Sequence, residues 1–434
     1  MRVRGSLSVP GDKSLTHRLL MLAGLTAGRS RLRGALTSLD ARSTAAVLRG
    51  LGIAISPLRP GRDVVIEGRQ RFRRPDRTLD CGNSGTTTRL LLGLLGAHRF
   101  ATRLTGDESL RRRPMRRVTE PLAQMGAHFG PEPPDRLPLT IRGNSLRPLE
   151  WRLPVSSAQI KGCLLFAGLA GKVPVALLEP SGRSRDHTER LLRAFGYSVT
   201  EDSAGWVRFS PTGTLTPFEL EVPGDPSSAA FLIGAALLAE SGQLQVTGVG
   251  LNPTRTGFLR VLERMGARVT VTPRGECCGE PVGDLQAEPG PLRATSVAAE
   301  EIPGLIDEIP ILAVLASRAS GVTRFHEVGE LRVKESDRLG LLAANLRAVG
   351  AQAVVEREDL VIEGSAKVPK GRIRTAADHR IAMAFAALRT APGAQVRVDN
   401  LACAEVSFPG FAAALGSVSE GRALRPRRSV GAAP

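Results

Sequence analysis

Small apolar helices that follow short polar turns recur along this chain, about 70 residues apart. Each turn carries Gly, Asp or Ser, and each runs into a stretch such as LLMLAGLTAG or AMAFAALRTA. The pattern predicts buried helices that begin at six turns, at residues 11–14, 82–85, 156–159, 224–227, 306–308 and 377–380. Because a helix N-terminus has free backbone N–H groups and the positive end of the helix dipole, six copies can gather around one anion site.

A second, amphipathic helix follows these openings and ends in Gly before a β-branched strand, as in MRRVTEPLAQMGAHF and TGFLRVLERMGARV. The glycines stand where a left-handed C-terminal cap belongs, at positions 52, 126, 196, 266 and 350. One repeat therefore reads as strand, helix, strand, helix and a final strand or hairpin. Units of this size suit an α/β fold of the α+β type, in which three units share one core.

The chain has 434 residues, more than one hydrophobic core usually serves, so the six repeats divide into two lobes of three. The predicted first lobe is 11–223, and the second lobe is 1–10 together with 224–418. By its own pattern, the N-terminal strand Val3–Val9 fits a sheet of either lobe.

Two segments lack periodicity. Residues 273–291 are rich in Gly, Pro and Glu and are predicted to be irregular. Residues 419–434 contain EGRALRPRRSVGAAP and are predicted to form a disordered basic tail. We therefore place no functional residue in either segment.

Composition narrows the class of protein. No apolar run reaches the roughly 18 residues of a membrane span, and the charged N-terminus lacks the apolar core of a signal peptide, so we expect a cytoplasmic protein. The five cysteines form neither a disulfide framework nor paired CxxC spacing, which fits reduced thiols and predicts no metal site.

The net charge of +17 fits two kinds of partner, nucleic acid and small anionic substrates. With one Tyr and two Trp, the chain has few aromatic side chains on which bases could stack, and its cations are scattered. Arg is by far the commoner cation, so each Lys within a motif is informative.

Three segments combine glycines with cations. In GDKSLTHR, Lys13 and Arg18 stand in and just beyond a first helical turn, which costs roughly 0.3–1 kcal/mol per charge unless an anion binds. Ser14 is a candidate helix cap there. In GNSGTTTRL, Gly85 either shapes a turn or lets a ligand approach the backbone. In DESLRRRPMRRV, Arg113 is the candidate for an anion clamp, and the other arginines fit a solvated loop.

Carboxylates accompany cations in two further segments. In GLIDEIPILAVLA, Asp307 is either a helix cap or an ionised general base. In ELRVKESDRLGLL we predict one helix, on which Lys334 and Arg338 lie at i and i+4 with Glu335 beside Arg338. That helix is either an anion clamp with an acid/base group or a structural helix whose charges satisfy one another. The segment TAADHRIAMAF adds an acid, an imidazole and a cation at one more opening.

The ordered motifs resemble the 5-enolpyruvylshikimate-3-phosphate synthase family to about residue 418, through GDKSLTHR, GNSGTTTRL, RRPM, SAQIK, SRDHTE, GDPSSAAF, NPTRTG, IDEIPILAV, LRVKESDRL and DHRIAM. The resemblance implies two lobes of three βαβαββ repeats with pseudo-threefold symmetry, two chain crossings and a cleft between the lobes. It also implies transfer of the enolpyruvyl group of phosphoenolpyruvate to the 5-hydroxyl of shikimate 3-phosphate by addition and elimination, releasing phosphate. No metal or cofactor, nucleic acid or membrane takes part, and a monomer is expected.

The resemblance also implies residue roles. Asp307 would accept the hydroxyl proton, Glu335 would move the proton at the methylene carbon, and Lys13 would support proton transfer. Shikimate 3-phosphate would be held by Lys13, Ser14, Arg18, Ser157, Ala158, Gln159, Arg185, Asp307 and Lys334. Phosphoenolpyruvate would be held by Lys13, Gly85, Arg113, Gln159, Arg338 and Arg380.

The chain departs from the family pattern at several positions. Ala158 replaces a Ser, Val406 replaces a Lys that contacts phosphoenolpyruvate, and Glu330 replaces an Asn that contacts shikimate 3-phosphate. The herbicide glyphosate occupies the phosphoenolpyruvate site in this family, and a small residue at Gly85 leaves room for it. Thr87 and Leu90, which differ from the commonest family residues, would reduce sensitivity to glyphosate.

Two alternatives are kept open. The sister enzyme that transfers enolpyruvyl to UDP-N-acetylglucosamine carries a reactive Cys in the loop that corresponds to Ser109–Arg117, where this chain has none. An RNA-binding or RNA-end-modifying protein on a related repeat fold would explain the charge, although the scarce aromatics count against it.

Overall fold

Helices begin at all six predicted turns in the computed structural model, which describes residues 1–131, 133–180 and 183–420. They are α1 (Lys13–Gly24), α3 (Gly85–Leu95), α6 (Ala158–Gly171), α8 (Pro226–Leu238), α10 (Ile309–Ala316) and α12 (His379–Leu388). Side-chain caps fix several of the starts. At α1 the carboxylate of Asp12 accepts a hydrogen bond from the Leu15 N–H at 2.8 Å. The interpretation of Ser14 as the cap is therefore wrong, because Asp12 occupies that position.

The predicted amphipathic helices are also present. They are α2 (Leu39–Gly50), α5 (Arg116–Gln124), α7 (His187–Ala194), α9 (Gly257–Arg264) and α11 (Arg338–Ala348). Each is followed by its predicted glycine in the left-handed region, with φ of 86° at Gly52, 110° at Gly126, 82° at Gly196, 71° at Gly266 and 88° at Gly350. Two shorter helices are α4 (Glu108–Arg112) and α13 (Phe411–Val418), and 3₁₀ turns are η1 (Ala299–Gly304), η2 (Gly329–Val333) and η3 (Ala402–Val406).

The strands of the first lobe form three four-stranded sheets with one plan, a parallel pair followed by antiparallel partners. Their orders are β14-β3-β5-β4, β6-β7-β9-β8 and β10-β11-β13-β12. Their bounds are β3 (Ala27–Arg33), β4 (Ala54–Ile55), β5 (Val64–Arg69), β6 (Leu79–Asp80), β7 (Ala101–Thr105), β8 (His128–Gly130), β9 (Leu139–Arg142), β10 (Leu149–Arg152), β11 (Val175–Leu178), β12 (Ser198–Glu201), β13 (Val207–Ser210) and β14 (Glu219–Glu221).

The second lobe repeats this plan in the orders β16-β17-β15-β2 and β18-β19-β21-β20, with the smaller pairs β22-β23 and β1-β24. Bounds are β1 (Arg2–Val3), β2 (Gly5–Ser8), β15 (Leu244–Gly250), β16 (Arg268–Cys277), β17 (Glu280–Glu288), β18 (Ser296–Val297), β19 (Val322–Phe325), β20 (Gln352–Glu356), β21 (Asp359–Glu363), β22 (Lys370–Ile373), β23 (Gln395–Val398) and β24 (Ser419–Glu420). Five repeats thus form the four-stranded sheet of this plan, and the described residues of the last repeat form the pair β22-β23, with β24 on β1.

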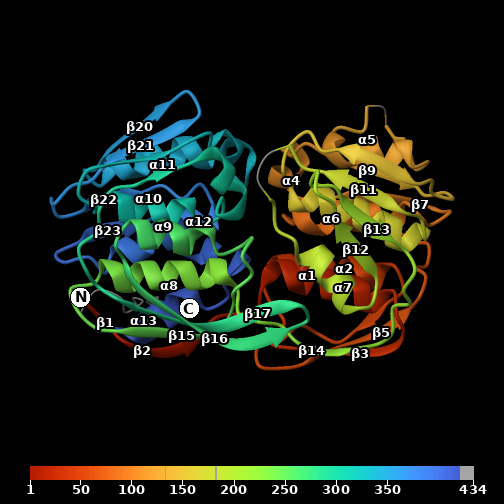
Figure 1. Cartoon of the computed structure of the whole chain (residues 1–434), viewed down its shortest axis with the longest axis horizontal. Helices are drawn as coiled ribbons and strands as arrows, with labels where there is room; N and C mark the ends of the chain where they lie inside the picture. Colours follow the sequence, from red (N-terminus) through yellow and green to blue (C-terminus); the bar gives the residue numbers. More distant parts are fainter. Residues whose placement is uncertain (132, 181–182, 421–434) are drawn as a thin grey trace, which may run out of the picture.

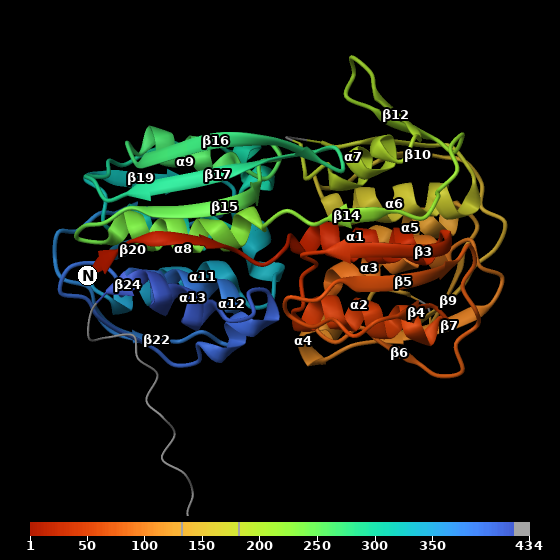
Figure 2. The ribbon, with the colours of Figure 1, turned by 90° about the horizontal axis from the view of Figure 1, so that it is seen from below.

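The N-terminal strand is separated in sequence from the lobe whose sheet it joins. The N-terminal strand β2 pairs in parallel with β15 of the second lobe, whereas β14 returns to pair with β3 of the first. Figure 2 shows β14 on the first lobe and the red N-terminal strand on the second, with the connecting segments passing between the lobes. The two crossings touch at the bridge between Gly11 and Gly224. A Cβ at Gly11 would lie 2.1 Å from the Gly34 carbonyl oxygen, so only Gly fits there.

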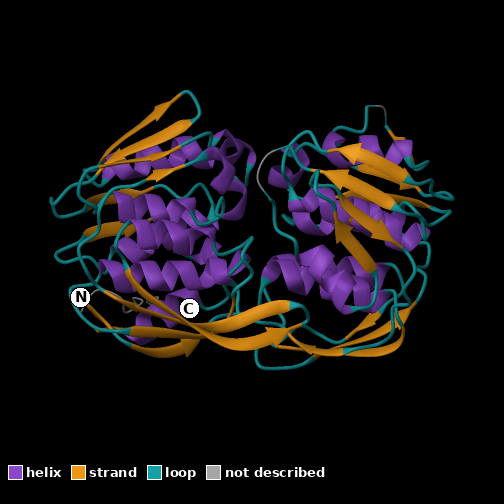
Figure 3. Cartoon of the chain, in the orientation of Figure 1, coloured by secondary structure: helices purple, strands orange, loops and turns teal. Residues whose placement is uncertain are grey.

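Each lobe has its own hydrophobic core. One core gathers buried residues between Leu15 and Val222, and the other gathers Val3, Val9 and residues from Ala229 to Val418. Helices fill the interior of each lobe and strands lie toward its outside (Figures 1 and 3). Every residue of α8, α10 and α12 is buried. We take the two crossings as the lobe boundaries, which remains a proposal.

Two sequence predictions about irregular segments need correction. Residues 268–288, expected to be irregular from 273 onward, form the hairpin β16–β17. Its two-residue turn, Cys278–Gly279, has φ of 57° and 75°, as a type I′ turn requires, and a register shift near Pro273 accommodates the proline. Ser419–Glu420, predicted to begin the disordered tail, instead pair with β1, and the rest of that prediction, at residues 421–434, lies outside the described residues.

Across the described residues, no helix has the length and apolar character needed to span a bilayer.

Candidate active site

The first helix presents Lys13 at the junction of the lobes. Its ammonium group forms an ion pair with Asp40 of α2, and its backbone N–H donates to Asp225 Oδ2 at 3.0 Å. Asp225 is the N-cap of α8 in the second lobe. Lys13 is therefore held by one acid from each lobe, and sequence reasoning did not single out Asp40.

Arg18 lies one turn further along α1 and is buried. Its guanidinium donates to Thr188 Oγ1 at 2.7 Å, to the Ser14 carbonyl at 3.0 Å and to the Ala158 carbonyl at 3.3 Å. Burial lowers the pKa of Arg18 to about 10, so it still carries its charge at neutral pH. The absence of a side chain at Gly162 leaves space for the Arg18 guanidinium, because a Cβ at this position would lie 3.1 Å from Nη2 of Arg18.

The openings of α3 and α6 meet at Gln159. Its side-chain oxygen accepts a hydrogen bond from Arg89, and its Nε2 donates to Thr86 Oγ1 at 3.0 Å. Ser157 is the N-cap of α6 without a side-chain capping bond, and Ala158 begins the helix. The structure thus brings these predicted contacts together, and it adds Arg89 as the group that orients Gln159.

Arg113 reaches the same place from the C-cap of α4. Its Nη2 donates to Asn83 Oδ1 at 2.6 Å, and its Nη1 lies 3.7 Å from Glu335 Oε1 of the second lobe. A Cβ at Gly85 would stand 3.0 Å from Arg89 Nη1 and 3.3 Å from Arg113 Nη1. Glycine at this opening therefore keeps the space in front of both guanidinium groups.

Asp307 lies just before α10, surrounded by cations from both lobes. Arg185 of the first lobe donates to its carboxylate, and Arg380 Nη2 and Arg338 Nη1 lie 3.3 Å and 3.6 Å from it. The N-cap position itself belongs to Glu308, so Asp307 is free of the capping role. Burial raises the pKa of Asp307, but the neighbouring cations outweigh burial and hold it well below its usual value.

Glu335 and Arg338 lie together, although not on one helix. Residues 334–337 form a loop between η2 and α11, and Asp337 caps α11 by accepting from the Gly340 N–H at 3.1 Å. The predicted continuous helix is therefore wrong, because this cap starts the helix at Arg338. Arg338 is fully buried and donates to Glu335 and, at 2.9 Å, to Asp378 Oδ2.

The protonation states of this acidic and basic cluster differ. Burial alone would raise the pKa of Glu335, but Arg338 and Arg113 hold it well below its usual value. His379, buried at the start of α12, has its pKa lowered to about 4 by burial. At neutral pH the site therefore contains ionised carboxylates beside a neutral imidazole.

Lys334 lies in the same loop, on the side facing the first lobe. Its Nζ lies 3.9 Å from Glu330 Oε1, and Glu330 also accepts from Arg117 of α5 at 3.1 Å. Glu330 stands where the family resemblance leads one to expect an Asn. Its side chain contacts Arg117 and Lys334.

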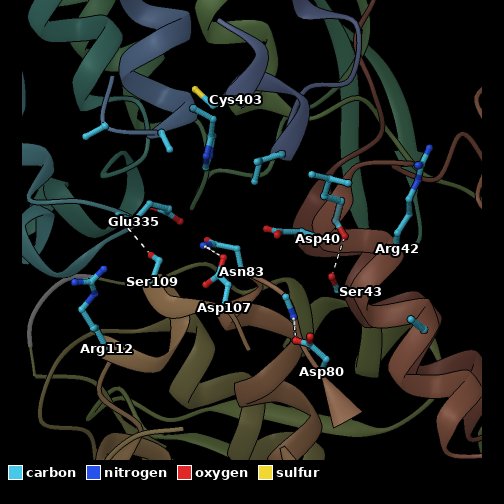
Figure 4. Close-up of a pocket in the computed structure, with 17 residues that line it drawn as sticks. Asp40, Arg42, Ser43, Asp80, Asn83, Asp107, Ser109, Arg112, Glu335 and Cys403 are labelled. Atoms are coloured by element: carbon cyan, nitrogen blue, oxygen red, sulfur yellow. Dashed lines mark hydrogen bonds between the residues drawn. The ribbon is translucent and has the colours of Figure 1, made fainter. Parts of the chain in front are cut away.

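A cavity of about 750 Å³ opens between the lobes beside Glu335. Figure 4 shows Glu335 opposite Ser109 and Asn83, with Asp40 on the neighbouring wall. Val406 also lines it, so the position of the expected Lys faces this space. Among the predicted catalytic residues, Glu335 lines the cavity, whereas Lys13 reaches its wall through Asp40.

Within the described residues, no group of three or more His, Cys, Asp or Glu side chains is arranged to hold a metal ion. The cluster offers fixed cations for anionic groups and two ionised carboxylates for proton transfer.

A model of EPSP synthase (3-phosphoshikimate 1-carboxyvinyltransferase) matches residues 1–415. The chain belongs to the EPSP synthase family. The 3-phosphoshikimate 1-carboxyvinyltransferase of Acidiphilium cryptum is 44% identical over 412 residues, covering 94% of this chain and 92% of that protein. That of Gloeobacter violaceus is 46% identical over 415 residues, covering 94% and 95%.

Solved structures agree with this membership. The EPSP synthase of Acinetobacter baumannii superposes with a TM-score of 0.84 at 35% identity, over 96% of each chain. The enolpyruvyl transferase NikO of Streptomyces tendae shares the fold alone, with a TM-score of 0.76 at 18% identity over 96% and 95% of the two chains. The predicted fold and enzyme class, an enolpyruvyl transferase of the shikimate pathway, are confirmed, in preference to the UDP-sugar and RNA alternatives.

Proposed function

We propose that this EPSP synthase family member uses Asp307, Glu335 and Lys13 to transfer the enolpyruvyl group of phosphoenolpyruvate to the 5-hydroxyl of shikimate 3-phosphate. The observation that carries the proposal is the convergence of buried cations from both lobes on two ionised carboxylates. Both substrates carry phosphate and carboxylate groups, which such a cluster favours.

Asp307 would act as the base for the attacking hydroxyl. With Arg185 and Arg380 against it, the carboxylate is ionised but weakly basic. The phosphate of shikimate 3-phosphate would engage Arg185 and so remove one cation from Asp307. The pKa of Asp307 would then rise, and the base would become effective only in the presence of substrate.

Glu335 would deliver a proton to the methylene carbon and later remove one from the resulting methyl group. Its low pKa depends on Arg338 and Arg113. When phosphoenolpyruvate neutralises these guanidinium groups, the carboxyl group gains proton affinity. Lys13 would bridge both substrates, after leaving its ion pair with Asp40.

The remaining candidate residues would bind one or the other of the two substrates. Shikimate 3-phosphate would lie against Ser14, Arg18, Ser157, Ala158, Gln159, Arg185 and Lys334. Phosphoenolpyruvate would lie against Gly85, Arg113, Gln159, Arg338 and Arg380, and glyphosate would compete with it there. A monomeric state and a cytoplasmic location also remain predictions.

The test is phosphate release from phosphoenolpyruvate in the presence of shikimate 3-phosphate. We expect turnover by the wild type and a loss of at least about 100-fold in Lys13→Ala and Glu335→Gln, the size that loss of acid–base catalysis produces. Lys367→Ala and Glu276→Gln, at exposed positions, are matched controls that should retain activity. Undiminished turnover in the Lys13 and Glu335 variants would refute the roles, and an inactive wild type would refute the function.

A further inference from the structure

Among the described residues, the lobes touch in several regions. One region surrounds the crossings, where His187 Nδ1 lies 2.7 Å from Glu280 Oε1 and Asn252 donates to Asp186 at 2.7 Å. In Figure 1 the crossings and the β16–β17 hairpin lie at the bottom, and α5 lies at the top of the first lobe. A contact from α5 to the second lobe therefore acts far from the crossings, where a small rotation of the lobes produces the largest displacement.

Such a contact exists between Arg117 of α5 and Glu330 of η2. Arg117 Nη1 lies 3.1 Å from Oε1 and 3.3 Å from Oε2 of Glu330. Both side chains are about one-third exposed, at 34% and 37%. Neither residue is among the proposed substrate ligands, so the pair need not break for the substrate to bind.

Glu330 also connects the contact to the proposed site. Its Oε1 lies 3.9 Å from Lys334 Nζ. Burial lowers the pKa of Lys334, and the charges of Asp307 and Glu330 oppose that shift. Glu330 therefore helps to keep Lys334 charged and lies beside its ammonium group.

We infer that Arg117 and Glu330 form a closing contact between the lobes, in which Glu330 serves as a positioning residue for Lys334 rather than as a substrate ligand. This inference deepens the proposed function and rests on it for the kinetic part. It also explains the departure at Glu330, because a carboxylate can pair with Arg117 across the cleft.

An opposite interpretation makes an opposite prediction. If Glu330 only repelled the anionic substrate, or merely occupied Arg117 until substrate arrived, removing its charge would strengthen binding. If the pair closes the cleft, removing either charge weakens binding. The sign of the effect of Glu330→Gln therefore decides between the two.

The experiment compares Arg117→Gln, Glu330→Gln, the double variant and the exchanged pair R117E/E330R. For each protein, small-angle X-ray scattering follows the radius of gyration during titration with shikimate 3-phosphate, and phosphate release gives kcat and KM. The half-closing concentration is the concentration of shikimate 3-phosphate at which the radius of gyration has made half of its change. We expect each single change to raise this concentration, and KM for shikimate 3-phosphate, about two- to fivefold, which is the range for an ion pair at this exposure. The double variant should be no worse than Glu330→Gln alone. The exchanged pair should return the radius of gyration without ligand to the wild-type value but not KM, because it replaces the carboxylate beside Lys334 with a cation.

Arg116→Gln is the matched control, because Arg116 lies next to Arg117 but pairs with Glu120 of the same helix at 3.5 Å. It should leave closure and kinetics unchanged. Tighter binding by Glu330→Gln, additive losses in the double variant, or unchanged closure in both single variants would each overturn the inference. We expect the radius of gyration without ligand to be larger in Arg117→Gln than in the wild type. This measurement requires no turnover, so it tests the closing contact even if the proposed function fails.

Discussion

At the scale of single residues, the site is a balance between acids and cations that already contact one another without substrate. Asp307 pairs with Arg185, Glu335 with Arg338, and Lys13 with Asp40. In each of these pairs, the carboxylate neutralises a cation that an anionic group of the substrate would bind. Binding then exchanges partners within a prearranged set, which reduces the reorganisation that catalysis requires.

Replacement of Gly85 by Ala tests how tightly this set is arranged. The added methyl group would stand 3.0 Å from Arg89 Nη1 and 3.3 Å from Arg113 Nη1, so it occupies the space in front of both guanidinium groups. We expect KM for phosphoenolpyruvate to rise about tenfold or more, as a loss of about 1.4 kcal/mol implies, with a smaller change for shikimate 3-phosphate. Glyphosate inhibition should weaken in parallel.

Steady-state kinetics at saturating second substrate provide the measurement. Gly416→Ala is the control, because that glycine lies in α13 and the methyl group of an alanine there would meet no atom within 4 Å. An unchanged KM for phosphoenolpyruvate in Gly85→Ala would show that the substrate does not approach this opening.

At the scale of elements, local sequence signals predicted the helix boundaries that local chemistry controls. Gly52 and Gly350 follow their helices in the left-handed region that few other residues adopt at low cost. The loop at 334–337 was missed because its helical periodicity continues through it. The side chain of Asp337 accepts a hydrogen bond from the Gly340 N–H, and this cap starts the helix at Arg338 in spite of the periodicity.

The β16–β17 hairpin was missed for a related reason. Gly and Pro normally argue against a strand, yet here a bulge absorbs Pro273 and the Cys278–Gly279 turn uses positive φ. Long-range pairing with β15 then supplies the stability that local propensity lacks.

The helix-ending glycines lead to a prediction about stability. Gly350 has φ of 88°, and a Cβ there would meet no atom within 4 Å, so the cost of Gly350→Ala is backbone strain alone. We expect a loss of about 1 kcal/mol in the free energy of unfolding. Gly350→Asn should lose less, because Asn tolerates this conformation better.

Urea denaturation of the full chain, followed by circular dichroism, measures this difference. Equal stability of Gly350→Ala and wild type would contradict the need for a left-handed residue. Gly416→Ala, in a helical conformation, again serves as the reference.

At the scale of the whole molecule, the site depends on contacts that no local pattern contains. The repeat and its motifs indicated which residues carry chemistry. They did not indicate that Lys13 pairs with Asp40, that Asn83 accepts from Arg113, or that Arg117 meets Glu330. The first two pairs join different segments of one repeat, and the third joins the two lobes, so only the assembled fold brings these residues together.

Because the second lobe takes β2 from the N-terminal segment, we expect the two lobes to differ in their ability to fold alone. A fragment of residues 11–223 contains β14 and can complete its sheet with β3. A fragment of residues 224–420 lacks β2, which pairs with β15, and also loses Val3 and Val9 from its core. We expect the first fragment to unfold cooperatively and the second to be unstable until a peptide of residues 1–10 is added.

Circular dichroism with and without the peptide checks this expectation. A scrambled peptide of the same composition is the control. A second-lobe fragment that is equally stable without the peptide would show that β2 contributes little and would weaken the proposed lobe boundaries.

The pairing of β2 with β15 also fixes the order in which the sheets can form during biosynthesis. β2 leaves the ribosome long before β15, so Gly5 must wait for its partner Leu244. At ordinary rates of translation this delay is on the order of ten seconds or more. During that time the first lobe can close its own sheet with β14 while the N-terminal segment is an unpaired strand, open to mispairing. Protection of this segment in the nascent chain is therefore a requirement that the finished enzyme no longer reveals.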